Sequence, residues 1–124
     1  MEEWNKGLMA HLGIRILETT PDKVVGELQV RDELKTTTSA VHGGTLMAFA
    51  DTIGAAGTVA NLTPEQSTAT LESKTNFFAA CKSGTIRAES TPLHRGKRTH
   101  VWQTRITDEN GKLLSLTTQT QMIL

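Results

Sequence analysis

HGGTLMAFADTIGAAGTVAN, residues 42–61, contains one charged residue after its histidine, Asp51, in a chain of which 21% is charged. At the α-helical period of about 3.6 residues per turn, its apolar side chains fall on one stripe. That stripe consists of Leu46, Phe49, Ala50, Ile53, Gly57 and Ala60. The other faces carry mostly small or apolar residues, so we expect a central helix that is buried on most sides by a sheet.

Four glycines, at positions 43, 44, 54 and 57, interrupt this helical pattern. Each interior glycine costs a helix about 1 kcal/mol relative to alanine. Glycine also lets another chain segment approach the backbone closely, because it has no Cβ. We therefore expect these glycines to serve close packing around the helix.

Asp51 is the isolated charge in this apolar window. A carboxylate in apolar surroundings is unfavourable unless it has a partner. One interpretation puts Asp51 at the rim of the helix, paired with a Lys or Arg from elsewhere, and the other makes it a catalytic group. The absence of any other charge between residues 43 and 61 favours the catalytic interpretation.

The helix is expected to begin at His42-Gly43-Gly44. A helix start offers unpaired backbone N–H groups and the positive end of the helix dipole. The two glycines let that backbone approach a ligand closely, and such a site stabilises a developing oxyanion. Together with the carboxylate of Asp51 further along the helix, it predicts acyl transfer to water.

The bulk composition excludes several function classes. The chain has 124 residues, which predicts one domain over residues 1–124, and Lys+Arg and Asp+Glu balance at 13 each. No overall charge favours nucleic acid or an anionic membrane. The lone Cys81 allows no intrachain disulfide, which fits a reducing, cytoplasmic setting. We expect neither a membrane span nor a signal peptide.

The other elements are predicted from periodicity and turn residues. A short amphipathic helix covers residues 2–12, with Gly13 as its stop, and strands cover 13–19 and 23–30. After the central helix, strands are expected over 69–77, 85–93, 99–107 and 112–124, with a basic bend at 94–98 and a hairpin turn at 108–111. Hairpin-linked strands beside one buried helix predict an α+β fold, with an antiparallel sheet wrapped around that helix.

Several segments together resemble a known family. They are the HGG motif with an acid nine residues after its histidine, HLGIRILE at 11–18, TLESKTNFFAA at 70–80, and LHRGKRTHVWQTRITDENGKLLSLTTQTQMIL at 93–124. In this order they resemble the hotdog-fold acyl-CoA thioesterases of the PaaI-like, phenylacetate-degradation branch. The resemblance implies the hotdog fold and hydrolysis of an acyl-CoA thioester to a carboxylic acid and free CoA.

The resemblance also implies roles for single residues. Asp51 stands at the position of the family's catalytic acid, a general base on water or a nucleophile on the thioester. Gly44 stands where a backbone N–H polarises the thioester carbonyl, with His42 shaping the turn. Thr70 matches a Ser or Thr that helps to place the attacking water from the partner subunit. Thr36 occupies a position where many members contact the substrate through an Asn or Gln, and it lacks that amide.

Substrate binding and assembly follow from the same resemblance. Gly43 joins the substrate-binding set at the helix start, and the active site is expected across the interface of a homodimer, which could assemble further into a tetramer. Coenzyme A carries phosphates, and Gly96, Lys97 and Arg98 belong to the densest basic cluster in the chain. The alternative for this cluster is a solvated hairpin bend.

No metal and no cofactor other than the CoA of the substrate is expected. The spacing between His42 and Asp51 is not one that recurs in metal sites, and one cysteine supplies no thiolate cluster. A thioester is already activated, so its hydrolysis requires only a positioned water or carboxylate and an oxyanion site.

Two alternatives of other classes stay open. A hotdog enoyl-thioester hydratase or dehydratase would move a proton without releasing a thiol, and the HGG-to-acid arrangement argues against it. A non-catalytic acyl-CoA-binding module would bind without turnover, and Thr36 is the residue that favours it. The residues do not decide the acyl group, nor whether Asp51 acts as base or nucleophile.

Overall fold

The computed structural model describes residues 4–124. Its elements are α1 (Gly7–Leu12), β1 (Arg15–Thr20), β2 (Lys23–Gln29), the 3₁₀ turn η2 (Asp32–Leu34), α2 (Gly43–Val59), β3 (Thr68–Phe77), β4 (Thr85–Arg95), β5 (Thr99–Thr107) and β6 (Leu113–Ile123). The predicted order of helices and strands is therefore confirmed.

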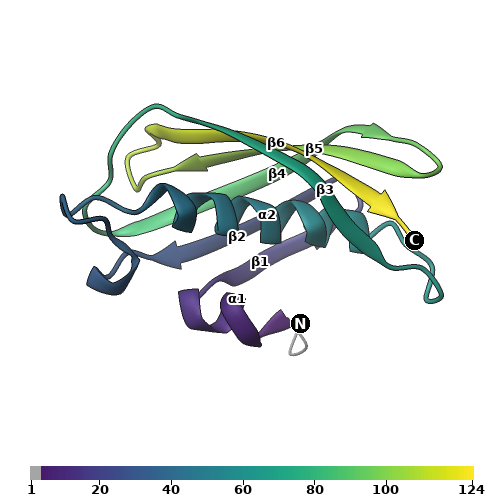
Figure 1. Ribbon diagram of the computed structural model, residues 1–124, viewed down its shortest axis with the longest axis horizontal. Coiled ribbons are helices and arrows are strands. Elements are labelled where there is room, and N and C mark those ends of the chain that lie inside the picture. The colour runs from purple at the N-terminus through teal and green to yellow at the C-terminus, as the bar shows by residue number, and fades with distance from the viewer. Residues whose placement is uncertain (1–3) are drawn as a thin grey trace.

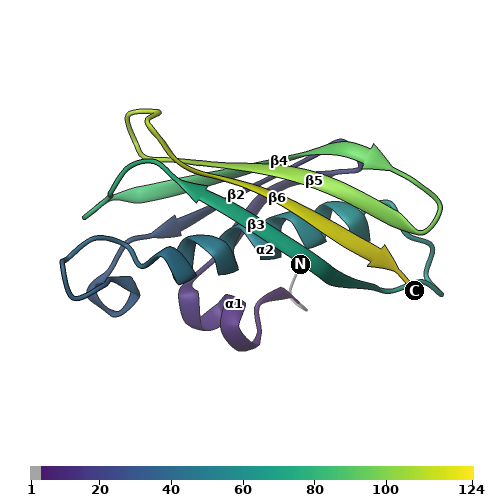
Figure 2. The ribbon, with the colours of Figure 1, turned by 45° about the horizontal axis from the view of Figure 1, so that its top comes forward.

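The strands form one six-stranded sheet with the order β1-β2-β4-β5-β6-β3, and every pair is antiparallel. The long helix α2 runs along one side of this curved sheet, and α1 lies near the β1 edge (Figures 1 and 2). Hairpins join β1 to β2, β4 to β5 and β5 to β6, whereas β3 comes directly after α2 and pairs with the last strand. The α+β fold, with an antiparallel sheet around one central helix, is confirmed.

The apolar stripe of α2 faces the sheet, as predicted. Leu46, Phe49, Ala50, Ile53 and Gly57 are buried, and Ala60 is the partly exposed C-cap of the helix. They pack against inward-facing residues of the strands, among them Val24, Leu28, Ile86, Ala88 and Ile106. This packing fixes which face of α2 turns away from the sheet.

The expectation that α2 is buried on most sides was wrong for a single chain. Met47 is 36% exposed and Val59 41% exposed, and Asp51 and Ala55 between them are only partly buried. The reason is geometric, because one sheet covers one side of a helix. We call this uncovered side, with Met47, Asp51, Ala55 and Val59, the open face of α2.

The glycines of α2 allow the close packing that the sequence predicted. A Cβ on Gly57 would lie 2.6 Å from the ring of Trp102, and a Cβ on Gly54 would overlap the side-chain amide of Gln119. From the sheet side, a Cβ on Gly26 would lie 2.5 Å from Ile53. Strands and helix thus meet more closely than side chains at these positions would permit.

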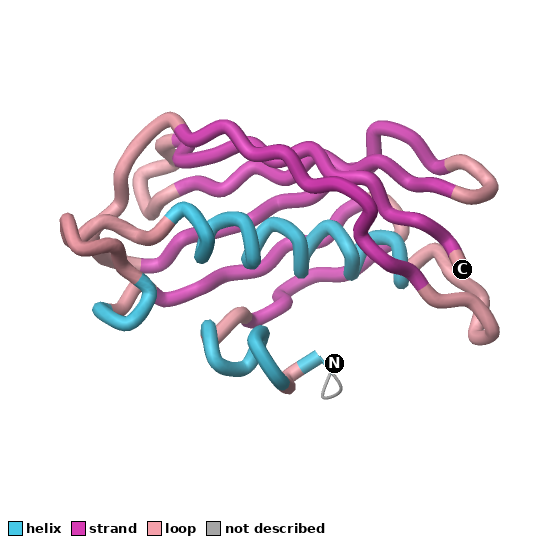
Figure 3. Tube along the Cα trace, viewed as in Figure 1, coloured by secondary structure: helices cyan, strands magenta, loops and turns pink. Residues whose placement is uncertain are grey.

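Several predicted boundaries shift, such as the start of β1, which lies at Arg15 rather than at residue 13. The helix predicted over 2–12 begins at Gly7, while positions 2 and 3 lie outside the described residues. The strand β4 continues through His94 and Arg95, which were assigned to the basic bend, because these residues pair with Val101 and His100. Only residues 96–98 connect β4 to β5. Figure 3 shows this turn at the same end of the molecule as the C-terminus.

The edge strand β3 contains an irregularity beside the middle of α2. Its pairing with β6 shifts register between Thr70 and Glu72, so that Leu71 is an extra residue. Such a bulge changes which side chains face the helix. Among residues 4–124, no helix is long and apolar enough to cross a membrane.

Candidate active site

Asp51 lies in the middle of α2, on the open face. Its Oδ1 atom accepts a hydrogen bond from Gln119 Nε2 at 3.0 Å. It also lies 2.6 Å from Thr70 Oγ1, whose single proton is shared between Asp51 Oδ1 and Gln121 Oε1, the latter at 2.5 Å. Gln119 Nε2 also lies 3.2 Å from the Asp51 carbonyl oxygen. Within residues 4–124, Oδ2 has no hydrogen-bond partner. One carboxylate oxygen is therefore held and the other is available.

Thr70 reaches Asp51 because of the bulge at Leu71. Thr70 lies opposite Gln121 on β6, and Ser73 lies opposite Gln119. Residues directly opposite in an antiparallel pair point to the same side of the sheet. Thr70 and Ser73 are three positions apart and still both face α2, which regular alternation would forbid. The structure thus brings two predicted site residues, Thr70 and Asp51, together within one chain.

Two glutamines beneath Asp51 were missed at the level of the sequence. Gln119 is fully buried and Gln121 is 1% exposed. They lie in an uninterrupted polar run, TTQTQ at 117–121, of residue types that are mostly exposed in proteins. The available signal was that these residues share one side of a strand. That β6 lies inside the sheet, with that side against α2, is visible only in the fold.

The start of α2 is capped by His42. The Gly44 N–H donates to His42 Nδ1 at 2.7 Å, and the N–H groups of Thr45 and Leu46 both donate to the His42 carbonyl. The N–H of Gly43 has no acceptor within the part of the chain that is described. In this conformation Gly43, rather than Gly44, presents the available donor at the helix start.

Thr36 lies in the loop that leads to α2, and its hydroxyl is engaged locally. It forms a hydrogen bond with the Thr38 hydroxyl at 2.7 Å and accepts from the Thr38 N–H at 3.0 Å. The loop is closed by the pairing of Lys35 with Val41, and Ser39 has a positive φ of 74°. Thr36 forms no hydrogen bond to Asp51 or His42 in this structure.

The predicted basic cluster lies away from the start of α2. The Gly96 N–H donates to the Thr99 carbonyl at 2.8 Å, which closes the turn, and Lys97 and Arg98 are exposed. Arg95 donates to Asp22 Oδ1 at 2.8 Å. In Figures 1 and 3 this turn lies at one end of the molecule and the start of α2 at the other. A single chain therefore does not bring Lys97 or Arg98 to the helix start.

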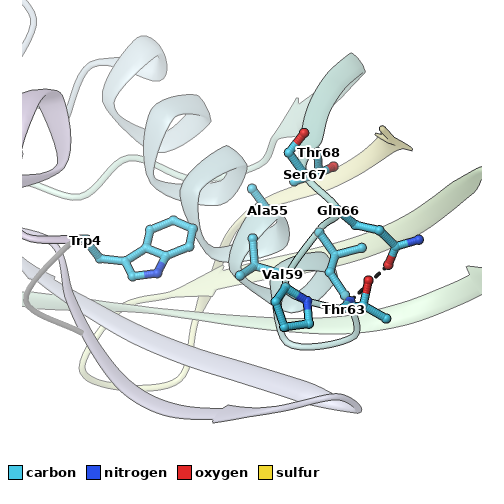
Figure 4. Close-up of a pocket in the computed structure, with 9 residues that line it drawn as sticks. Trp4, Ala55, Val59, Thr63, Gln66, Ser67 and Thr68 are labelled. Carbon is cyan, nitrogen blue, oxygen red and sulfur yellow. Dashed lines mark hydrogen bonds between the residues drawn. The ribbon is translucent and has the colours of Figure 1, made fainter.

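A pocket of about 680 Å³ opens beside the second half of α2. Figure 4 shows Trp4 across this pocket from Ala55 and Val59, with residues 63–68 on the remaining side. Leu62 and Pro64 add to its apolar lining, whereas Thr63, Gln66, Ser67 and Thr68 are polar. Ala55 and Val59 follow Asp51 at intervals of four residues, so the pocket continues the open face that carries the carboxylate.

Comparison with known proteins gives the family. Residues 38–115 match the family model described as the thioesterase superfamily. The chain belongs to this superfamily. It is 31% identical over 110 residues to a 1,4-dihydroxy-2-naphthoyl-CoA hydrolase of Listeria monocytogenes, covering 89% of each chain. A hydrolase of the same description from Escherichia coli is 30% identical over 117 residues, covering 94% of this chain and 86% of that one.

Solved structures agree with the hotdog architecture. A thioesterase from Haemophilus influenzae superposes with a TM-score of 0.95 at 26% identity, covering 99% of this chain and 86% of that chain. The predicted family and the hotdog fold are confirmed, and so is the expectation that this enzyme is a thioester hydrolase.

Metal-ligating side chains are dispersed in this hotdog thioesterase. Within residues 4–124, no group of three or more His, Cys, Asp or Glu side chains is close enough to hold a metal ion. The lone Cys81 is partly buried, and its Sγ donates to the Ser83 carbonyl at 3.3 Å.

A second buried polar cluster joins α2 to β5. The indole Nε1 of Trp102 donates to Thr58 Oγ1 at 2.9 Å, and the same hydroxyl lies 3.1 Å from His100 Nδ1. Burial lowers the pKa of His100 below its usual range, and the positive charges of Arg95 and His94 lower this pKa further. The indole is only a donor, so Thr58 Oγ1 accepts from Trp102; when the neutral imidazole carries its proton on Nε2, His100 Nδ1 is the acceptor for the Thr58 proton.

Proposed function

We propose that the protein hydrolyses an acyl-CoA thioester to a carboxylic acid and free CoA, with Asp51 acting through Oδ2. The observation that carries this proposal is the asymmetry of the carboxylate. Two donors hold Oδ1, while Oδ2 has no partner within residues 4–124 and belongs to the open face of the helix. A carboxylate held in this way has one oxygen aligned for reaction and little freedom to rotate.

Two routes use the same oxygen. As a general base, Oδ2 takes a proton from water while the water oxygen bonds to the thioester carbon; the C–S bond then breaks and the CoA thiolate takes up a proton. As a nucleophile, Oδ2 bonds to that carbon and expels the thiolate, and water then hydrolyses the mixed anhydride. Both routes develop negative charge on the carbonyl oxygen, which the N–H groups at a helix start stabilise.

The helix start and Asp51 of one chain are too far apart to act on one thioester. Asp51 lies eight positions after Gly43, which corresponds to about 12 Å along a helix. We therefore infer that the donor and the carboxylate of one site come from two subunits. The exposed edge strand β3 carries Leu71 and Phe77, and Phe78 follows its last residue; all three are 50–57% exposed. An uncovered apolar edge of this kind favours pairing with a second copy.

The acyl group has a candidate position in the pocket behind Asp51. Ala55 and Val59 extend from the carboxylate into this pocket, and Trp4 provides a flat apolar wall (Figure 4). An apolar acyl chain or aryl ring suits such a lining. For the phosphates of CoA, Lys97 and Arg98 are candidates, because neither forms an ion pair within the described residues.

The first experiment measures thiol release from a panel of acyl-CoAs by the wild type and Asp51→Asn. The amide keeps the shape of the carboxylate, and loss of a general base typically lowers a rate on the order of 10²- to 10⁴-fold. Asp22→Asn is the control, because it changes an exposed aspartate that pairs with Arg95. Equal release by the wild type and the folded Asp51→Asn would contradict the assignment of Asp51. Binding of acyl-CoA by the wild type without release would favour the binding module.

A second experiment tests the shared site. Gly43→Pro removes one N–H at the first helical position, where proline is well tolerated, and Gly43→Ala keeps that N–H. Gly43→Pro and Asp51→Asn homodimers should both be inactive, while Gly43→Ala measures the separate effect of the added Cβ, which would lie 3.1 Å from the ring of Phe77. If each site combines two subunits of a two-fold dimer, randomly mixed Gly43→Pro and Asp51→Asn subunits should regain about a quarter of the wild-type rate. No recovery in verified mixed dimers would place both groups in one subunit.

A further inference from the structure

Four polar side chains form a row between the sheet and Asp51. Thr68 and Thr70 come from β3, and Gln119 and Gln121 come from β6. Both glutamines are almost completely shielded from solvent, with exposures of 0% for Gln119 and 1% for Gln121. A buried amide keeps one orientation when its nitrogen faces acceptors and its oxygen faces donors, because a flip would reverse every contact.

The direction of each hydrogen bond follows from one backbone carbonyl. The Thr68 hydroxyl donates to the Met122 carbonyl at 2.7 Å, so its oxygen is free to accept from Gln121 Nε2 at 3.0 Å. This turns Gln121 Oε1 toward Gln119, whose Nε2 donates to it at 2.9 Å. Reversing either amide would bring two acceptors or two donors together.

The amide of Gln119 therefore presents nitrogen to Asp51. Its Nε2 has three acceptors within reach, namely Gln121 Oε1, Asp51 Oδ1 and the Asp51 carbonyl. Its Oε1 is buried and has no hydrogen-bond partner within residues 4–124. A buried oxygen without a partner is unfavourable and calls for an explanation. The unpartnered Gln119 oxygen is the consequence of pointing the Gln119 nitrogen at Asp51, which fixes the orientation of the carboxylate.

Gly54 makes this orientation possible. It lies three residues after Asp51 on α2, and any Cβ at that position would overlap the terminal amide of Gln119. A larger residue would push the amide away from the helix and from the carboxylate. Gly54 thus leaves the space in which the Gln119 amide lies, and from there the amide donates to the carbonyl and the carboxylate of Asp51.

We propose that Gln119 is a positioning residue of the thioesterase site, which holds Asp51 Oδ1 together with Thr70 so that only Oδ2 faces the thioester. This inference rests on the proposed role of Asp51. Gln119 does not touch the substrate and acts through the carboxylate. Gln121 and Thr68 fix the direction in which Gln119 donates.

A purely structural role for Gln119 makes a different prediction. If the side chain only filled space between β6 and α2, its replacement would lower the free energy of unfolding and leave the rate per folded molecule unchanged. A positioning role changes kcat while KM stays nearly constant, because the substrate contacts are intact.

The test compares steady-state thiol release by the wild type and Gln119→Met over a range of acyl-CoA concentrations. Methionine has a similar length and no N–H donor. Removing a hydrogen bond to a charged group should lower kcat on the order of 10- to 100-fold. KM should stay nearly constant, because Gln119 does not touch the substrate. The control is Thr104→Val, which removes a buried polar group away from Asp51, a hydroxyl that donates to Ser90 at 2.9 Å, and it should leave kcat and KM unchanged.

A double-mutant cycle tests the route through Gly54. Gly54→Ala displaces the Gln119 amide and should lower kcat in the wild-type background. In the Gln119→Ala background there is no amide to displace, so adding Gly54→Ala should have little further effect. Equal effects of Gly54→Ala in both backgrounds would contradict an action through Gln119.

The outcomes separate this inference from the proposed function. If Asp51→Asn abolishes release while folded Gln119→Met keeps the wild-type kcat, the positioning role of Gln119 is wrong and Asp51 stays catalytic. If Asp51→Asn releases thiol at the wild-type rate, the proposed role of Asp51 fails and the role of Gln119 fails with it, although the protein still hydrolyses the thioester. Should Gln119→Met not unfold cooperatively, Gly54→Ala takes its place, and an unchanged kcat there overturns the inference.

Discussion

The cluster around Thr58 and the cluster around Asp51 both join α2 to the sheet through buried side-chain hydrogen bonds, seven residues apart on the helix. The first closes on itself, because Thr58 accepts from the Trp102 indole and forms its second hydrogen bond with His100 Nδ1. The second ends at a carboxylate whose Oδ2 has no partner among residues 4–124. Both clusters use buried hydrogen bonds between helix and sheet. The Thr58 cluster has all its partners inside the protein and contributes to stability, whereas the Asp51 cluster leaves one acceptor oxygen for a ligand.

The largest effect on stability should come from opening the closed cluster with Thr58→Val. Valine keeps the shape of threonine but leaves Trp102 Nε1 and His100 Nδ1 without their partner. Each buried group orphaned in this way costs about 1–3 kcal/mol. The free energy of unfolding, measured in urea, should fall accordingly, while thiol release per folded molecule stays unchanged. Thr58→Ser keeps the hydroxyl and is the matched control; an equal loss in both variants would assign the effect to packing.

Alanine at the two helix glycines should distinguish the clusters further. In Gly57→Ala the new methyl group would lie 2.6 Å from the ring of Trp102, which is fully buried. Such overpacking costs about 1–3 kcal/mol. In Gly54→Ala the methyl group meets the flexible end of Gln119, so the loss of unfolding free energy should be smaller and the loss of activity larger. If the ratio of lost activity to lost unfolding free energy is the same in Gly57→Ala and Gly54→Ala, the distinction between the two clusters is wrong.

The pH dependence of folding should report on the closed cluster alone. Burial lowers the pKa of folded His100, and Arg95 and His94 lower it further, whereas an unfolded histidine titrates near pH 6.5. The unfolded chain then binds more protons below about pH 6.5, so this contribution to stability is complete above that pH and is lost on acidification. Urea unfolding between pH 8 and pH 5 should show a smaller decline for His100→Asn, which keeps an acceptor near the position of Nδ1. An equal decline would contradict the assignment.

The smallest effect should come from Ser73→Ala, beside the open cluster. Ser73 Oγ is buried and forms no hydrogen bond within the described part of the chain. Its removal should change the free energy of unfolding by about 0.5 kcal/mol or less, because no hydrogen bond is lost. Thr75→Val is the control, since it removes the hydrogen bond to Thr117 at 2.7 Å. A change in kcat for Ser73→Ala would extend the Asp51 cluster to this serine.

The central helix and its buried stripe could be predicted because both follow from periodicity within one segment. The stripe at Leu46, Phe49 and Ile53 is a local signal, and so is the isolation of Asp51. The exposure of Met47 and Val59 could not be predicted, since it depends on how much of the helix one sheet covers.

The partners of Asp51 were only half predictable. Thr70 was found by resemblance, whereas Gln119 comes from 68 positions away along the chain, in an uninterrupted polar run of residue types that are mostly exposed in proteins. At the helix start, glycines indicated available donors. That His42 itself occupies the Gly44 N–H depends on the rotamer of the imidazole, which no pattern of residue types specifies.

Because Leu71 is the extra residue of β3, the two halves of that strand face α2 with opposite parity: residues 68 and 70 before it, 73 and 75 after it. Deleting position 71 would restore regular alternation and turn the Thr70 hydroxyl away from Asp51, even though no residue of the site had been replaced. The length of this strand, as much as its residue types, therefore encodes the site.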